Sequence, residues 1–127
     1  MGSKILKILV VDDDLFFRES IIRILAYRFP DFEVEESTDG VNAYAKAEGA
    51  FESKRPFDCI ITDRNMSRMG GDELSGKIRE LDTSVKIIMM STRLPIQKMS
   101  NVNHLIKKDI DFTYALIEIL RSMIEAE

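Results

Sequence analysis

The stretch Cys59-Ile60-Ile61-Thr62-Asp63-Arg64-Asn65-Met66 decides how we interpret the whole chain. It opens with a short apolar run of the kind that forms a buried strand. The run ends at the carboxylate of Asp63, and a polar, glycine-containing segment follows as far as Gly71. Because open α/β sheets bind their ligands at the carboxyl ends of the strands, Asp63 is a candidate functional residue.

Four other apolar runs alternate with helical patterns along the chain. The five expected strands cover residues 5–11, 32–36, 58–62, 85–90 and 104–106. The expected helices cover residues 15–29, the stretch with Ala43, Ala47 and Ala50, the stretch with Leu74, Ile78 and Leu81, and residues 109–127. Alternation of this kind predicts an α/β fold with parallel strands and right-handed crossovers.

Four of these five expected strands end in a polar functional group. The groups are Asp12 and Asp13, then Asp63, then Ser91, then Lys107. Taken singly, each has a structural explanation: helix capping for the first acids, a loop acid, a strand-end hydroxyl and a solvated lysine. Because parallel strands place their carboxyl ends along one edge, their joint occurrence favours a single functional site.

The chemistry of that site follows from its charges. Two carboxylates about 4 Å apart repel each other by about 4 kcal/mol at an effective dielectric constant of about 20. Mg²⁺ relieves this repulsion, and oxygen ligands without histidine or cysteine favour it over Zn²⁺. A lysine and a hydroxyl at the same edge suit phosphoryl oxygens. Asp63 is therefore a candidate nucleophile that forms an aspartyl phosphate.

Composition bounds the class of protein. The 127 residues suffice for one domain, with 45% hydrophobic and 31% charged residues. The net charge of -4 and the scattered basic residues argue against binding to nucleic acid or to an anionic membrane surface. No run is long enough to span a bilayer, no secretion signal is visible, and Cys59 is the single cysteine. We therefore expect a cytoplasmic domain over residues 4–127, with 1–3 as a cloning remnant.

These segments together resemble the receiver domain of bacterial response regulators, the CheY-like family. The resemblance runs from Lys4 to about Ile124. The matching segments are Ile8 to Asp14, Ser37 to Gly40 with Ala43, Asp58 to Asp63 followed by Met66, Met69, Gly71 and Glu73, and Lys86 to Ser91. It implies a flavodoxin-like, doubly wound sheet of five parallel strands in the order 2-1-3-4-5. Because the segment between Ser91 and Lys107 is short, the fourth helix is expected to be short or missing.

The resemblance also implies roles for the residues at the strand ends. Asp63 would accept a phosphoryl group from a phosphohistidine of a histidine kinase or phosphotransfer protein. Asp13, Asp63 and the backbone carbonyl of Asn65 would hold Mg²⁺ directly, and Asp12 would act mainly through bound water. Ser91 and Lys107 would contact the phosphoryl oxygens.

Several positions depart from the family pattern. Lys108 stands where the family usually has proline after its lysine, and His104 occupies the switch position that is usually aromatic. We interpret His104 as a plain strand residue rather than as a titrating switch. Thr92 replaces a small residue beside the switch hydroxyl, where it crowds access to Asp63.

The closing helix carries a second apolar flank made of Ile110, Ile117 and Ile124. This flank is consistent with two roles: covering core that a shortened fourth helix exposes, which we favour slightly, or forming a homodimer or partner surface.

We therefore expect a phosphoacceptor signalling domain that acts through a downstream protein or output domain. Its only catalysis would be its own phosphotransfer and autodephosphorylation. An atypical receiver that signals without phosphorylation is the first alternative. A Mg²⁺-dependent aspartyl-phosphate phosphatase is less favoured, because Asn65 occupies the place of its usual second acid. A flavodoxin-like cofactor binder is disfavoured because the three aspartates after the first strand would repel a phosphate.

Overall fold

The computed structural model describes residues 4–94 and 99–125, which form a five-stranded sheet between two layers of helices. The elements follow in the order β1 (Lys7–Val11), α1 (Leu15–Arg28), β2 (Glu33–Ser37), α2 (Gly40–Glu52), β3 (Cys59–Asp63), α3 (Gly71–Leu81), β4 (Lys86–Ser91), β5 (His104–Lys107) and α4 (Phe112–Glu125). All neighbouring strands are parallel, in the order β2-β1-β3-β4-β5. This order confirms the predicted fold.

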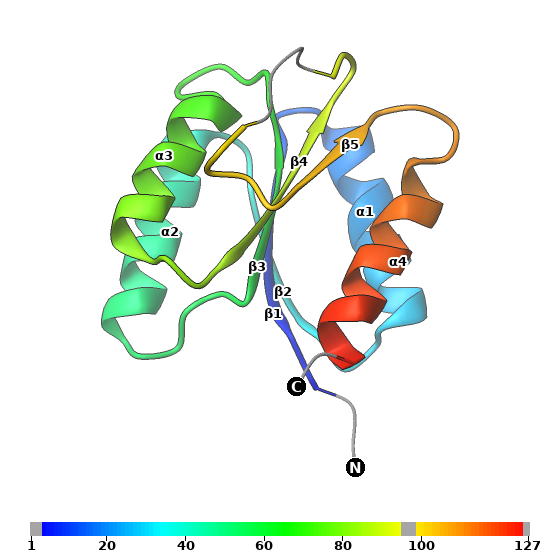
Figure 1. Ribbon diagram of the computed structural model, residues 1–127, viewed down its shortest axis with the longest axis horizontal. Coiled ribbons are helices and arrows are strands. Elements are labelled where there is room, and N and C mark those ends of the chain that lie inside the picture. Colours follow the sequence, from blue (N-terminus) through cyan, green and yellow to red (C-terminus); the bar gives the residue numbers. More distant parts are fainter. Residues whose placement is uncertain (1–3, 95–98, 126–127) are drawn as a thin grey trace.

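The helices cover the two faces of the sheet in pairs. Figure 1 shows α2 and α3 on one side of the sheet and α1 and α4 on the other. Successive strand residues point to opposite faces, so each strand contributes to two hydrophobic clusters. Ile8, Val10 and Ile61 pack with α1 and α4, whereas Leu9 and Ile60 pack with α2 and α3. None of the helices in the described part of the chain has the length and apolar character needed to cross a bilayer.

The connection between β4 and β5 lacks a helix wherever the structure describes it. Residues 92–94 and 99–103 form bends, turns and irregular chain, and residues 95–98 lie outside the described part. Arg79 of α3 anchors this connection: its guanidinium donates hydrogen bonds to the carbonyl oxygens of Val85 at 2.7 Å and Asn101 at 2.9 Å. The Asn103 side-chain oxygen accepts from Arg79 at 3.0 Å and from the Ile87 amide at 2.8 Å. These bonds position the start of β5.

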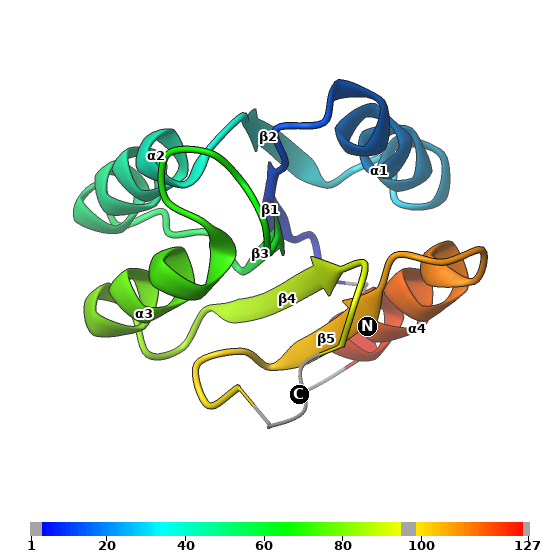
Figure 2. The same cartoon turned by 90° about the horizontal axis from the view of Figure 1, so that it is seen from above.

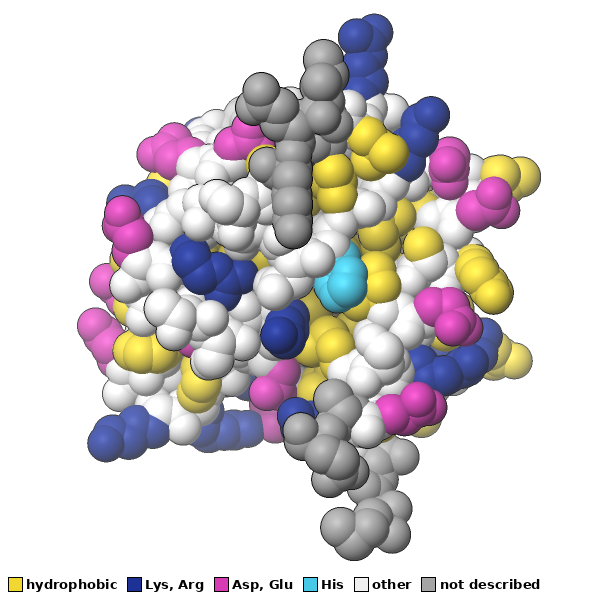
Figure 3. Space-filling model, viewed as in Figure 1, with side chains coloured by type: hydrophobic (Ala, Val, Ile, Leu, Met, Phe, Trp, Pro, Cys, Tyr) yellow, Lys and Arg dark blue, Asp and Glu magenta, His cyan; other side chains and the backbone are white. Residues whose placement is uncertain are grey.

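Among the residues that the structure describes, β5 forms one edge of the sheet and pairs with β4 alone (Figure 2). Space-filling Figure 3 shows hydrophobic side chains around the single histidine, His104, on the face of the molecule where β5 lies. Its side chain is exposed at the amino-terminal end of β5, where it pairs with Ile88 of β4.

The proposed apolar flank of the closing helix divides into different environments. Ile110 precedes α4 and is 93% exposed, so it does not belong to the helix face with which we grouped it. Ile124 packs against the hydrophobic cluster of the α1–α4 side, which agrees with the core-covering role. Ile117 is half-buried. A homodimer through α4 stays a prediction.

Candidate functional site

Three carboxylates from two neighbouring strands meet at the carboxyl edge of the sheet. Asp12 and Asp13 directly follow β1, and Asp63 is the last residue of β3, which pairs in parallel with β1. One oxygen from each side chain lies within 4.8 Å of the others. Asp12 and Asp63 are buried, whereas Asp13 is exposed. The topology therefore brings these predicted residues together, as the parallel arrangement requires.

Backbone amides orient each carboxylate. Asp12 Oδ1 accepts from the Asp14 amide at 2.9 Å, and Asp63 Oδ1 accepts from the Arg64 amide at 2.9 Å. Asp13 Oδ2 accepts a longer bond, 3.3 Å, from the amide of Ser67 in the β3–α3 loop. These contacts hold the acids in place without neutralising them.

The third aspartate of the run has a different role. Asp14 caps α1, since its Oδ1 accepts from the amides of Phe16 at 2.9 Å and Phe17 at 3.3 Å. The capping explanation that we left open for the acids after the first strand therefore applies to Asp14. Asp12 and Asp13 face the site instead.

A lysine bridges two of the acids, but it is Lys108 and not Lys107. Lys108 Nζ lies 3.1 Å from Asp12 Oδ2 and 3.0 Å from Asp63 Oδ1. Its side chain is only 12% exposed. Lys107 is the last residue of β5 and its side chain is exposed. The expectation that Lys107 faces the site therefore needs correction by one residue.

The alternation of side chains along β5 explains this correction. Ile106 packs in the same hydrophobic cluster as Val10 of β1 and Ile61 of β3, so all three face α1 and α4. Two residues further along these strands lie Asp12, Asp63 and Lys108, which share that face. Lys107 points the other way. The signal that would have found Lys108 is the spacing of two residues from the buried Ile106.

The same shift by one residue removes His104 from the switch position. The switch position lies three residues before the site lysine, so counting from Lys108 it falls on Leu105, whose side chain is half-buried. His104 lies at the amino end of β5, away from the carboxyl edge. There it lines a pocket of about 390 Å³ together with Lys86 and Asp58. Partial burial and the nearby charge of Lys86 lower the pKa of His104.

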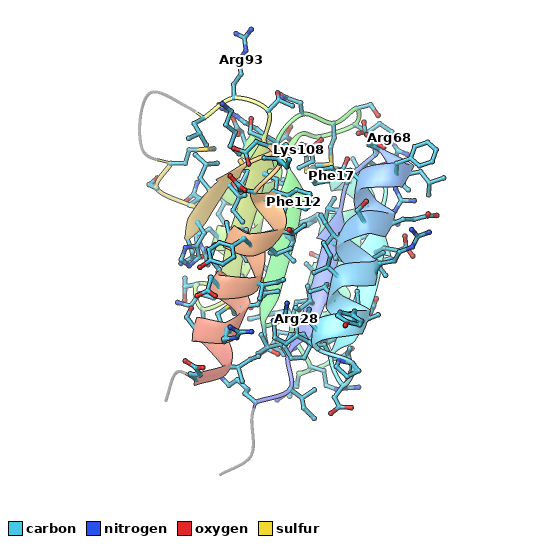
Figure 4. All side chains as sticks on the ribbon, turned by 90° about the vertical axis from the view of Figure 1, so that its right-hand side faces the viewer. Phe17, Arg28, Arg68, Arg93, Lys108 and Phe112 are labelled. Atoms are coloured by element: carbon cyan, nitrogen blue, oxygen red, sulfur yellow. The ribbon has the colours of Figure 1, made fainter. Side chains whose placement is uncertain are left out.

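The other predicted site residues surround the acids without contacting them through a hydrogen bond described in the structure. Ser91 is buried at the end of β4, and its hydroxyl oxygen accepts from the Arg93 amide at 3.2 Å. The Ser91 carbonyl accepts from the Lys108 amide at 2.7 Å, which ties β4 to the lysine. Thr92 and Asn65 are exposed in the loops that follow β4 and β3. The Arg93 side chain extends away from the molecule (Figure 4).

The loop after Asp63 folds back tightly on its own strand. The Gly71 amide donates to the carbonyl of Arg64 at 2.7 Å. A Cβ atom at Gly71 would lie 2.5 Å from the carbonyl oxygen of Asp63, so only glycine fits there. Met69 adopts a left-handed backbone with φ of 73°, and its backbone packs against Gly40 at the start of α2. The loop thus packs closely against the backbone of Asp63.

Arg18 is a supporting residue that we did not predict from the sequence. Its side chain is buried and donates to the carbonyl of Asp12 at 2.7 Å and to Glu36 Oε1 at 2.7 Å. The residue shares an inward helix stripe with Ile21 and Leu25, the other buried residues of α1. A charged residue at a position of an apolar stripe is the signal that would have found it.

The electrostatics of the cluster combine burial with charge. Burial raises the pKa of the Asp12 carboxyl, and the negative charge of Asp63 adds to this, although the Asp14 amide and Lys108 oppose it. Burial alone would lower the pKa of Lys108, but its hydrogen bonds and attraction to Asp63 and Asp12 outweigh that effect and raise it. One ammonium thus contacts two of the three clustered carboxyl groups, and this set of oxygen ligands fits a divalent cation such as Mg²⁺.

Cys59 does not take part in this chemistry. It is fully buried in β3, and burial raises the pKa of its thiol. The thiolate is the reactive form of cysteine, so this side chain behaves as a small hydrophobic residue.

Comparison with known proteins agrees with this arrangement. Residues 8–113 match the profile of the response regulator receiver domain. The transcriptional regulatory protein DegU of Brevibacillus brevis is 33% identical over 103 residues, which cover 80% of this chain and 40% of that protein. The response regulator MprA of Mycobacterium avium is 35% identical over 88 residues, which cover 69% of this chain and 36% of that protein. The chain therefore spans well under half of these relatives.

Solved structures show the same fold. Chemotaxis protein CheY4 of Vibrio cholerae has a TM-score of 0.77 and 28% identity, covering 94% of this chain and 98% of that one. A CheY-like receiver domain protein of Methanospirillum hungatei has a TM-score of 0.79 and 24% identity, covering 96% and 95% of the two chains, and supports the fold alone. With the profile matched over most of its length, the chain belongs to the response regulator receiver domain family.

Proposed function

We propose that Asp63 is the phosphoacceptor of this receiver domain and that its phosphorylation requires Mg²⁺. The observation that carries this proposal is the cluster of Asp12, Asp13 and Asp63 within 4.8 Å, bridged by Lys108 at the carboxyl edge of a parallel sheet. The domain extends over residues 4–127 in this proposal and works in the cytoplasm.

The residues at the carboxyl edge of the sheet have different roles in this reaction, and Asp63 is the nucleophile. Asp63 Oδ1 accepts bonds from the Arg64 amide and from Lys108, which leaves Oδ2 as the oxygen that these two donors do not engage. In the proposed reaction an Asp63 oxygen attacks phosphorus, the bond from phosphorus to the donor's imidazole nitrogen breaks, and that nitrogen is left to take up a proton. The donor is a histidine kinase or a phosphotransfer protein.

Asp12, Asp13, Asp63 and the carbonyl of Asn65 are the groups that would hold Mg²⁺. When bound, Mg²⁺ neutralises the clustered carboxylates and lowers the cost of bringing phosphoryl oxygens to them. Lys108 has three N–H donors, so it can contact a phosphoryl oxygen while it keeps a bond to an acid. The Ser91 hydroxyl is a second donor for that group, and Thr92 flanks the approach.

The phosphorylated domain acts by contact with a downstream protein or with an output domain. Phosphorylation adds negative charge at one edge of the sheet, and a partner reads the resulting change in the surface. The only reactions of the domain itself in this proposal are acceptance of the phosphoryl group and its hydrolysis.

Acetyl phosphate labelling tests the proposal. We expect the folded wild-type protein to gain the mass of one phosphoryl group in the presence of Mg²⁺, and to gain none with EDTA. Asp63→Asn should remove labelling, whereas Asp111→Asn, which changes an exposed carboxylate that is not one of the clustered acids, should not. A folded wild-type protein that gains no mass would instead support a receiver that signals without phosphorylation.

A further inference from the structure

The ammonium of Lys108 contacts an aromatic ring in addition to the acids. Lys108 Nζ lies 4.2 Å from the ring centroid of Phe17, in the first turn of α1. The ring of Phe17 in turn packs against Phe112, the first residue of α4, with 4.7 Å between centroids and 34° between planes. Figure 4 shows the three side chains together where α1 and α4 approach the site.

The contact with Phe17 restricts the Lys108 side chain, which the ion pairs alone leave free to adopt several conformations. A lysine side chain has four flexible torsions, and fixing them costs conformational entropy. The two acids attract the ammonium, whose Nζ lies 3.1 Å from Asp12 Oδ2 and 3.0 Å from Asp63 Oδ1. The face of Phe17 also attracts the ammonium, and the low exposure of the Lys108 side chain keeps water away, which strengthens both contacts. Phe112 limits the movement of that ring.

We propose that Phe17 is a positioning residue for Lys108, and that the Phe17–Phe112 pair links the site to the packing of α1 against α4. The first part concerns the protein as it stands. The second part rests on the proposed function: when Asp63 carries a phosphoryl group, the Lys108 ammonium moves toward the added oxygens and its position over the Phe17 ring changes. The contact between α1 and α4 then reports the state of Asp63.

Two substitutions of one residue and a matched control separate this role from general stability. Phe17→Leu removes the ring and keeps an apolar side chain, whereas Phe17→Tyr keeps a ring face. Phe29→Leu is the control, because Phe29 caps the opposite, carboxyl-terminal end of α1 and its ring stacks on Phe32 with 4.7 Å between centroids.

The first measurement is the NMR chemical shift of the Lys108 ε-methylene group, identified by its loss in Lys108→Met. In the unphosphorylated wild type we expect an upfield ring-current shift. This shift should vanish in Phe17→Leu and persist in Phe17→Tyr and Phe29→Leu. An unchanged shift in Phe17→Leu would overturn the proposal. This measurement does not need phosphorylation, so it stands even where labelling of the wild type fails and the proposed function falls.

The second measurement is the rate constant of labelling at saturating acetyl phosphate and Mg²⁺. A cation–π contact of this kind predicts a loss of about five- to thirtyfold in Phe17→Leu, and rates within about twofold of wild type for Phe17→Tyr and Phe29→Leu. Equal losses in Phe17→Leu and Phe29→Leu, or no loss in either, would overturn the positioning role.

The third measurement tests the link to the helices. Adding Mg²⁺ and acetyl phosphate should shift the ring resonances of Phe17 and Phe112 in the wild type, and should leave those of Phe29 and Phe32 unchanged. Labelled protein whose Phe17 and Phe112 resonances do not move would overturn the link between Asp63 and the α1–α4 contact.

Discussion

The acids and the lysine of this site reach the same edge of the sheet in different ways. β1 and β3 are interior strands with a neighbour on each side, and their register pairs Val11 with Thr62, so the following acids are placed by the sheet itself. β5 is a four-residue edge strand, and the lysine lies one residue beyond its end. The difference teaches that the acids are placed by strands paired on both sides, whereas the face that Lys108 takes is set by one paired strand and by the packing of Ile106 toward α1 and α4.

The largest expected effect comes from the two neighbouring lysines. Lys108→Ala removes the only cation that bridges the acids within the described residues, and we expect a loss of about a hundredfold in the labelling rate constant, as for other single donors to developing charge. Lys107→Ala should stay within about twofold, because that side chain is exposed. A larger loss of labelling rate in Lys107→Ala than in Lys108→Ala would show that Lys107 is the lysine of the site. Acetyl phosphate labelling followed by mass spectrometry gives both values.

The placement of the acid Asp63 is tested at Gly71, which packs against the Asp63 backbone. Gly71→Ala would place a methyl group against the Asp63 carbonyl, and we expect a loss of about 2 to 3 kcal/mol in the free energy of unfolding. Gly49→Ala is the matched control inside α2, where a Cβ meets nothing within 4 Å. That change should stabilise the protein by about 0.5 to 1 kcal/mol. Urea unfolding measures both, and equal values would contradict the close approach.

Substitution of Arg18 tests the hydrogen bond that this residue donates to the backbone carbonyl of Asp12. Arg18→Met leaves the buried carbonyl of Asp12 without its donor, and we expect a loss of about 2 kcal/mol in the free energy of unfolding. Arg23→Met is the control on the same helix, because Arg23 is 84% exposed and lies 3.9 Å from Glu19. The control should change stability by less than about 0.5 kcal/mol. Denaturant unfolding separates the two, and similar losses would show that the contact to Asp12 contributes little.

The smallest effect concerns His104 at the start of β5. Because folding lowers the pKa of this imidazole, the unfolded chain binds more protons than the folded chain at pH values near and below the pKa of the unfolded chain. Stability should therefore fall as the pH drops below about 6.5, and this loss is small for an exposed side chain. His104→Gln should remove that part of the slope of unfolding midpoint against pH, and Lys86→Met should reduce it. A slope that His104→Gln leaves unchanged would assign it to other groups.

Much of the fold follows from local patterns in the chain. Five apolar runs alternating with helical patterns predict the number of strands, their parallel direction and, through the family resemblance, their order, which the structure confirms. Asp12, Asp13 and Asp63 follow their runs directly, so their convergence needs no detail beyond parallel pairing. These inferences depend on short-range periodicity and on one topological rule, and both are readable from a single sequence.

The sequence by itself thus determined the sheet and the acids at its carboxyl edge. Only the tertiary structure decided that Lys108 rather than Lys107 faces them, that Asp14 caps α1, and that Arg18 contacts Asp12 and Phe17 contacts Lys108. The reason is that a shift of one residue turns a side chain to the opposite face of a sheet. The spacing from Ile106 gives the face only once Ile106 is known to pack toward α1 and α4, and that packing brings Lys108 to Asp12, 96 residues away along the chain.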